Sequence, residues 1–146
     1  QGLNTILMGG DALITQEYWS ITGPAGEGTL MTFSPDPRKN PAAAEVVKRF
    51  KDKDIEPEGY VLYTYAALQA WKQAAEKAKS VEKDDIIKAL NDTEFDTVIG
   101  KIKLENNIPK NAFWEIGQWQ DGFFVGVGPQ RQGAAAVVIP KPAWKQ

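Results

Sequence analysis

The 146-residue sequence contains no cysteine and no histidine. These absences exclude nucleophilic catalysis by Ser–His or Cys–His pairs and zinc sites built from cysteine or histidine. They also remove the side chain that most often acts as a general base near neutral pH. No pair of carboxylates has the spacing of a catalytic dyad, and no run of acidic residues has the spacing of a calcium loop. We therefore expect a protein that is not an enzyme and needs no metal and no cofactor.

Long hydrophobic runs and an excess of positive charge are also absent. No apolar stretch approaches the ~20 residues that a membrane helix needs. Lys and Arg number 17 against 19 Asp and Glu, which gives a net charge of −2. Without a basic stripe, nothing indicates a nucleic-acid partner. The hydrophobic content of 42% and the charged content of 25% are ordinary for a globular domain with a real core.

Hydrophobic periodicity predicts alternating strands and helices in the first half of the chain. Apolar runs at residues 4–9 and 28–33 predict strands, with a helix over 15–22 between them. Asn40 followed by Pro41 is a strong helix start signal. The apolar residues after it have the spacing of one helix face: Ala43, Val46, Val47 and Phe50. Because this alternation is typical of parallel sheets with crossover helices, the predicted fold class is α/β.

The second half of the chain changes from helices to hairpins. Residues 60–78 form the longest helical pattern, and Ser80 is a candidate cap for a further helix. That helix is expected to turn three residues inward: Ile86, Ile87 and Leu90. From Thr97 the pattern alternates, and Asp121-Gly122 is a hairpin turn signal. The aromatic residues of this region are expected to pack within the hairpin: Trp114, Trp119, Phe123 and Phe124.

Asp11 places a charge where a strand ends. It follows Leu7 and Met8, which are expected to be buried, and two glycines. Ligands of open α/β sheets bind outside the carboxyl ends of strands, and a carboxylate there can pair with an ammonium group. The alternative is that Asp11 caps a turn or the next helix, and the pattern alone favours this alternative.

Tyrosine side chains open the long helix at Tyr60, Tyr63 and Tyr65. Each offers a flat apolar face and a hydroxyl group, which suit a small-molecule pocket. For any one of them, packing in the core is the favoured alternative.

Four stretches in this order have the character of one family: TILMGGDALIT, GPAGEGTLMTFSPDPRKNPAAAEVVKRFK, GYVLYTYAALQAW and FDTVIGKIKLE. Together they resemble the C-terminal part of periplasmic solute-binding proteins of the branched-chain amino acid type, which serve ABC importers. The resemblance implies the type I periplasmic binding fold, with two Rossmann-like α/β lobes that close on a ligand. It implies that residues 1–56 end the second lobe, and that residues 57–96 are helices of the first lobe. Residues 97–146 would then be a hinge crossing and the closing strands, including C-terminal β-hairpins.

The resemblance also implies a binding site and partners. Asp11 stands where amino-acid binders hold the α-ammonium of the ligand, and Tyr60 stands where an aromatic residue covers the ligand, so we now favour Asp11 as a ligand contact. The implied partners are an amino acid or small carboxylic acid, the importer's membrane subunits, and a missing N-terminal part of the same protein. The implied location is periplasmic, or extracellular with a membrane tether.

Two alternatives remain open from the sequence. The first is a ligand-sensing domain of a receptor or regulator built on the same fold. The second is a binding protein for aromatic or aliphatic carboxylic acids, whose ligands have no ammonium group for Asp11.

Overall fold

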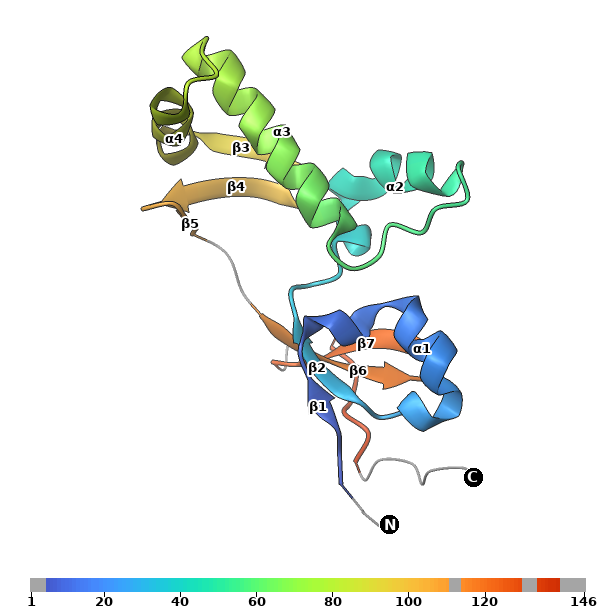
Figure 1. Cartoon of the computed structure of the whole chain (residues 1–146). Helices are drawn as coiled ribbons and strands as arrows, with labels where there is room; N and C mark the ends of the chain where they lie inside the picture. Colours follow the sequence, from blue (N-terminus) through green and yellow to red (C-terminus); the bar gives the residue numbers. More distant parts are fainter. Residues whose placement is uncertain (1–4, 111–113, 130–133, 140–146) are drawn as a thin grey trace. The chain divides into compact units, whose positions relative to one another are not determined.

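The computed structural model of the chain describes residues 5–110, 114–129 and 134–139. The chain forms two compact units, which are drawn in Figure 1. Unit 1 combines Gln1–Pro35 with Phe113–Gln146, and unit 2 is the continuous stretch Asp36–Ala112. The two units are defined by contacts between residues of this chain. The assignment of residues 1–56, 57–96 and 97–146 to two lobes of a larger protein stays a prediction.

Unit 1 is built on a four-stranded sheet in the order β1-β2-β6-β7. Strand β1 pairs in parallel with β2, and β2 and β7 both pair antiparallel with β6. Between the parallel strands lie two 3-10 turns and one helix, which is the predicted α/β crossover. The bounds are β1 Met8–Gly9, η1 Asp11–Ile14, α1 Gln16–Thr22, η2 Gly23–Gly26, β2 Leu30–Phe33, β6 Glu115–Gln120 and β7 Phe123–Gly128. The beginning of the strand predicted over residues 4–9 lies outside the described residues.

The predicted hairpin at Asp121-Gly122 is confirmed. It joins β6 to β7, and both turn residues have positive φ angles, 53° and 81°, as a tight turn between twisted strands requires. Trp119 is buried on this hairpin and stacks on Trp19 with ring centroids 5.4 Å apart. In contrast, Trp114 and Phe123 are 61% and 73% exposed, so the prediction of hairpin packing is wrong for these two side chains.

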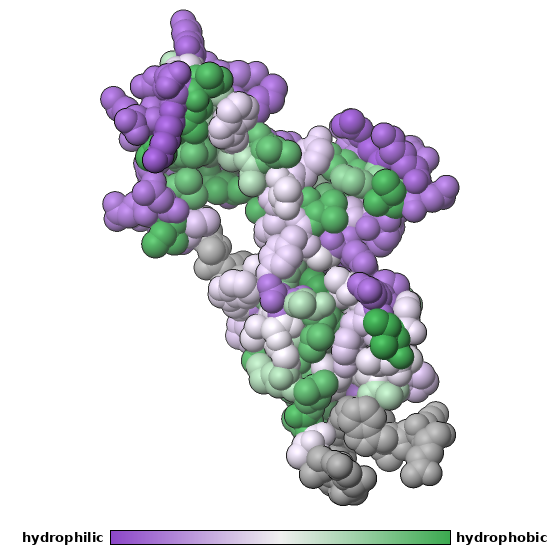
Figure 2. Space-filling model, viewed as in Figure 1, coloured by the Kyte–Doolittle hydropathy of each residue, from purple (hydrophilic) through white to green (hydrophobic). Residues whose placement is uncertain are grey.

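The expected burial of Leu7 and Met8 is also wrong for this chain. Their side chains are 46% and 53% exposed. β1 is a two-residue edge strand: β2 lies on one side, and no other strand within the described ranges pairs with it. These side chains therefore lack the cover that neighbours on both sides of a strand provide. Figure 2 shows hydrophobic residues, in green, among hydrophilic ones on the visible face of the molecule.

Unit 2 packs three helices with a three-stranded antiparallel sheet in the order β3-β4-β5. The predicted helix start at Asn40 is confirmed, because its side-chain oxygen accepts a hydrogen bond from the backbone N–H of Ala42 at 2.9 Å. The long helix is confirmed as α3. The bounds are η3 Pro37–Lys39, η4 Pro41–Ala43, α2 Ala44–Lys51, α3 Val61–Ala78, α4 Lys83–Asp92, β3 Glu94–Thr97, β4 Gly100–Glu105 and β5 Ile108–Pro109. In the described parts of the chain, no helix is long and apolar enough to cross a membrane.

Helix α3 contributes to both hydrophobic clusters of unit 2. The first cluster comprises Ala43, Val46, Leu62, Ala66 and Val98. The second comprises Ala70, Ala74, Ile86, Ala89 and Phe95. These clusters connect α3 to α2 on one side and to α4 and β3 on the other.

Three details of unit 2 differ from the sequence-based expectations. Ile87 is 39% exposed, and Ala89 takes its place in the core of α4. Ser80 does not cap α4: Glu82 is the N-cap residue, and the Ser80 hydroxyl accepts a hydrogen bond from the Glu82 N–H in the preceding turn. The period-two segment begins at Glu94, three residues before Thr97.

Candidate functional site

Asp11 lies in the first turn of η1, immediately after the carboxyl end of β1. Because β1 pairs in parallel with β2, this is an edge of the sheet where α/β proteins bind ligands. Gly10 precedes it in extended conformation, and Asp11 is half-buried. Its carboxylate therefore sits at the boundary between sheet and solvent, where a charged ligand group can reach it.

The turn that carries Asp11 is fixed by Trp119. The indole N–H of Trp119 donates a hydrogen bond of 2.8 Å to the backbone oxygen of Leu13. Trp119 is 2% exposed and is itself held by stacking against Tyr18 and Trp19. Sequence reasoning assigned Trp119 to hairpin packing and missed this second role, because the two residues are more than a hundred positions apart.

Tyr60 stands at the N-cap position of α3 in unit 2. Its side chain is 49% exposed, and its ring meets the Tyr63 ring edge-on at a centroid distance of 6.4 Å. Tyr65, one turn further, packs against the first hydrophobic cluster. The core-packing alternative therefore holds for Tyr65, while Tyr60 keeps a surface that a ligand can cover. Asp11 and Tyr60 belong to different units, and their participation in one site stays a prediction.

A charged cluster in unit 2 connects the turn before α2 to the segment before Tyr60. The guanidinium of Arg38 donates to both carboxylate oxygens of Asp36 at 2.9 Å and to Glu56 at 2.8 Å. Burial raises the pKa of the Asp36 carboxyl, but the hydrogen bonds and charge of Arg38 outweigh it, so the pKa lies below its ordinary value of 3.8. The hydrogen bond to Asp36 raises the pKa of Arg38, which stays charged.

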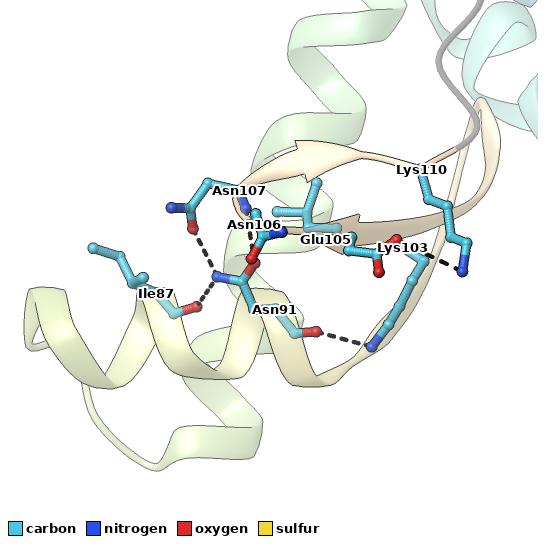
Figure 3. A pocket seen from close by; sticks show the side chains of 8 residues that line it. Ile87, Asn91, Lys103, Glu105, Asn106, Asn107 and Lys110 are labelled. Carbon is cyan, nitrogen blue, oxygen red and sulfur yellow. Dashed lines mark hydrogen bonds and ion pairs between the residues drawn. The ribbon is translucent and has the colours of Figure 1, made fainter.

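A polar hollow of about 460 Å³ lies between the end of α4 and the β4–β5 turn. Figure 3 shows the Asn91 side chain donating to the Ile87 and Asn107 oxygens, while the Lys103 ammonium donates to the backbone oxygen of Asn91 at 2.9 Å. Lys110 lies 3.7 Å from Glu105. These polar groups bind one another, and their hydrogen bonds connect the end of α4 to the β4–β5 hairpin. Neither Asp11 nor Tyr60 lines it.

Over the described ranges, no group of three or more acidic side chains is arranged to hold a metal ion. What the two candidate positions offer is one carboxylate for a cationic group and one aromatic face for an apolar group.

Comparisons with known proteins agree with the predicted α/β fold class. The sequence model of the periplasmic binding protein family matches residues 1–122. The chain is 44% identical over 124 residues to Leu/Ile/Val-binding protein homolog 1 of Brucella suis, which covers 84% of this chain and 33% of that protein. It is 36% identical to an amino acid binding protein of Pseudomonas aeruginosa, over 83% of this chain and 33% of that protein.

Solved structures show the same fold. The leucine binding protein LivK of Thermotoga maritima matches with a TM-score of 0.73 and 24% identity, over 86% of this chain and 37% of that one. A solute binding protein of Rhodopseudomonas palustris in complex with benzoate matches with a TM-score of 0.66 and 21% identity, over 88% of this chain and 38% of that one. The fold is therefore the type I periplasmic binding fold in partial form. The chain spans about a third of the length of the curated relatives it matches, and it belongs to the periplasmic binding protein family.

Proposed function

We propose that this chain forms part of an extracytoplasmic solute-binding protein of an ABC importer. The protein binds an amino acid of branched-chain type, or a similar small solute, in a cleft between two lobes. Residues 1–56 and 97–146 contribute to the second lobe, and residues 57–96 contribute helices to the first. The observation that carries this proposal is a half-buried carboxylate, Asp11, at the carboxyl end of a parallel strand, in a chain whose relatives are named for binding leucine, isoleucine and valine.

In this proposal Asp11 accepts a charge-assisted hydrogen bond from the α-ammonium of the ligand, and the Tyr60 ring covers the ligand. Such bonds are about twice as strong as neutral ones. The ligand stabilises the closed arrangement of lobes only by binding it more tightly than the open one. The importer's membrane subunits then recognise the closed form. No covalent step is involved, and the location is the periplasm or the outer face of the membrane.

The test uses a completed protein, in which the chain is joined to the part of the Brucella suis relative that it does not span. A thermal-shift screen with leucine, isoleucine, valine, polar amino acids and benzoate identifies the ligand. A ligand at ~100 times its Kd adds about 2.7 kcal/mol to the stability. The Asp11→Ala variant is expected to weaken amino-acid binding by ~2–5 kcal/mol in calorimetry, as when one partner of a buried charge pair is removed.

The matched control is Glu17→Ala, which removes an exposed carboxylate from the first turn of α1 and is expected to leave the Kd unchanged. An Asp11→Ala variant that binds the amino acid as tightly as the parent would contradict the ammonium role. The benzoate complex of the Rhodopseudomonas palustris structure favours a second candidate, an aromatic carboxylic acid. A stability gain with benzoate alone, unaffected by Asp11→Ala, would support that candidate.

A further inference from the structure

The segment that leads into Tyr60 has little regular structure of its own. Between the end of α2 at Lys51 and the start of α3 at Val61, the chain forms turns at residues 52–54 and 59–60 with an irregular stretch between them. Two of its backbone hydrogen bonds are local: the Ile55 N–H donates to the Phe50 oxygen at 3.1 Å, and the Glu58 N–H to the Glu56 oxygen at 2.9 Å. Such a segment needs contacts from elsewhere to hold one conformation.

Arg38 supplies such a contact across 18 residues of sequence. Its Nη1 donates to Glu56 Oε1 at 2.8 Å, while Nε and Nη2 bind both oxygens of Asp36. Asp36 is tied to its own turn as well, because it accepts the backbone N–H of Arg38 at 3.0 Å. The planar guanidinium fork is thereby fixed on one side by Asp36 and presents its remaining edge to Glu56.

The burial of this cluster distinguishes it from the ordinary surface ion pairs of unit 2. The Asp36 side chain is 13% exposed and that of Arg38 32%, whereas Lys48 and Asp52 are 73% and 57% exposed. Partial burial reduces screening by water and salt, so the Asp36–Arg38 pair restricts its turn more than an exposed pair does. Glu56 is itself 45% exposed, and its link to this turn is the short hydrogen bond from Arg38 at 2.8 Å. Pro57, the residue after Glu56, is fully buried and fixes the chain at the next position.

We propose that Arg38 is a positioning residue for Tyr60. By holding Glu56, it anchors the segment four residues before Tyr60, so that the tyrosine ring is ordered before any ligand arrives. Pro57, Glu58 and Gly59 connect the anchor to Tyr60, and Gly59 makes the turn into α3 with a φ of 56°. An ordered ring lowers the entropy cost of binding. The consequence for the ligand rests on the proposed function, whereas the effect on Tyr60 does not.

The experiment labels the 146-residue chain with 3-fluorotyrosine and records fluorine NMR spectra. The four tyrosines give four resonances, and Tyr60→Phe assigns the one of interest. In Arg38→Ala and in Glu56→Ala, the Tyr60 resonance is expected to shift and narrow as the ring becomes mobile. The resonances of Tyr18, in unit 1, and Tyr65, against the first hydrophobic cluster, are expected to stay. Lys48→Ala, which removes only the exposed pair with Asp52, is the matched control and should leave Tyr60 unchanged.

The outcomes separate positioning from stability and from function. If Arg38→Ala also displaces the Tyr65 resonance, its fold is altered, and Glu56→Ala decides, because it removes the acceptor of the Arg38 hydrogen bond and keeps the Asp36–Arg38 pair. A Tyr60 resonance that is the same in parent and Glu56→Ala overturns the proposal. In the completed protein, Arg38→Ala should raise the Kd for the amino acid about two- to tenfold, which corresponds to the ordering of one side chain. An unchanged Kd would contradict the effect of Arg38 on ligand binding. If the parent protein binds no amino acid, the proposed function is wrong. The NMR result still tests in that case whether Arg38 positions Tyr60.

Discussion

At the scale of single residues, Gly117 controls the packing of the β6–β7 hairpin. Gly117 is buried, and a Cβ atom at this position would overlap the Phe124 ring of β7. We predict that Gly117→Ala pushes this ring away and lowers the free energy of unfolding by about 1–3 kcal/mol, the usual cost of overpacking. Urea unfolding followed by tryptophan fluorescence measures the change.

Two comparisons make this prediction specific. Gly10→Ala is the control, since nothing lies within 4 Å of its added Cβ and its φ of −89° suits any residue; it should change stability by less than about 0.5 kcal/mol. In a Phe124→Ala background, Gly117→Ala should cost much less, because the clash is removed. Equal costs in both backgrounds would show that the ring is not the cause.

The sequence predicts residues well where their surroundings are local. Asp11 was placed at a strand end because the strand, the glycines and the charge are neighbours in the chain. Arg38 and Glu56 were not paired, because their contact joins two irregular segments that have no periodicity to align them. The exposed state of Met8 is not predictable in this way either, since burial of a strand's side chains depends on which distant segments pack over the faces of the sheet.

At the scale of elements, the apolar face of α2 predicted from the sequence can be tested by mutation. Val46 is 9% exposed and packs with Leu62 and Val98 in the first hydrophobic cluster. Val46→Asp would bury a carboxylate without a partner, and we predict a loss of more than about 3 kcal/mol in the free energy of unfolding. Ala44→Asp is the control, because Ala44 is exposed and an acidic residue in the first helical turn is favourable. Equal stability of the two variants would contradict the burial of this face.

Helix starts and tight turns were predictable, whereas the inward face of α4 was only partly so. Asn40 acts by capping the backbone N–H of Ala42, and Asp121-Gly122 act by adopting positive φ angles. Both effects are local, so the residue types alone predict them. For α4, hydrophobicity favours Ile87 as a core residue, but the helix packs against the small residues Ala70 and Ala74 of α3. Close approach of two helices favours another small residue at the contact, and Ala89 provides it. Side-chain size, rather than hydrophobicity, decided this position.

At the scale of the whole molecule, unit 2 has the features of a segment that can fold independently. It is one continuous stretch, Asp36–Ala112, and both hydrophobic clusters of this stretch draw all their buried residues from it. A compact segment with its own core can fold alone. The rest of the chain is different, since unit 1 is assembled from two segments separated in sequence.

We therefore predict that residues 36–112, produced alone, fold with the helical far-UV circular dichroism expected from α2, α3 and α4. Urea should unfold the fragment in one cooperative transition with a free energy of a few kcal/mol, because a segment of this size buries a small core. The same fragment carrying Val46→Asp is the control, and it should lose the transition. Leu68 and Trp71 are 65% and 46% exposed on α3, so the measurement belongs at low protein concentration. A non-cooperative, coil-like fragment would mean that the clusters of unit 2 need residues outside it, and that the division into two units does not reflect independent stability.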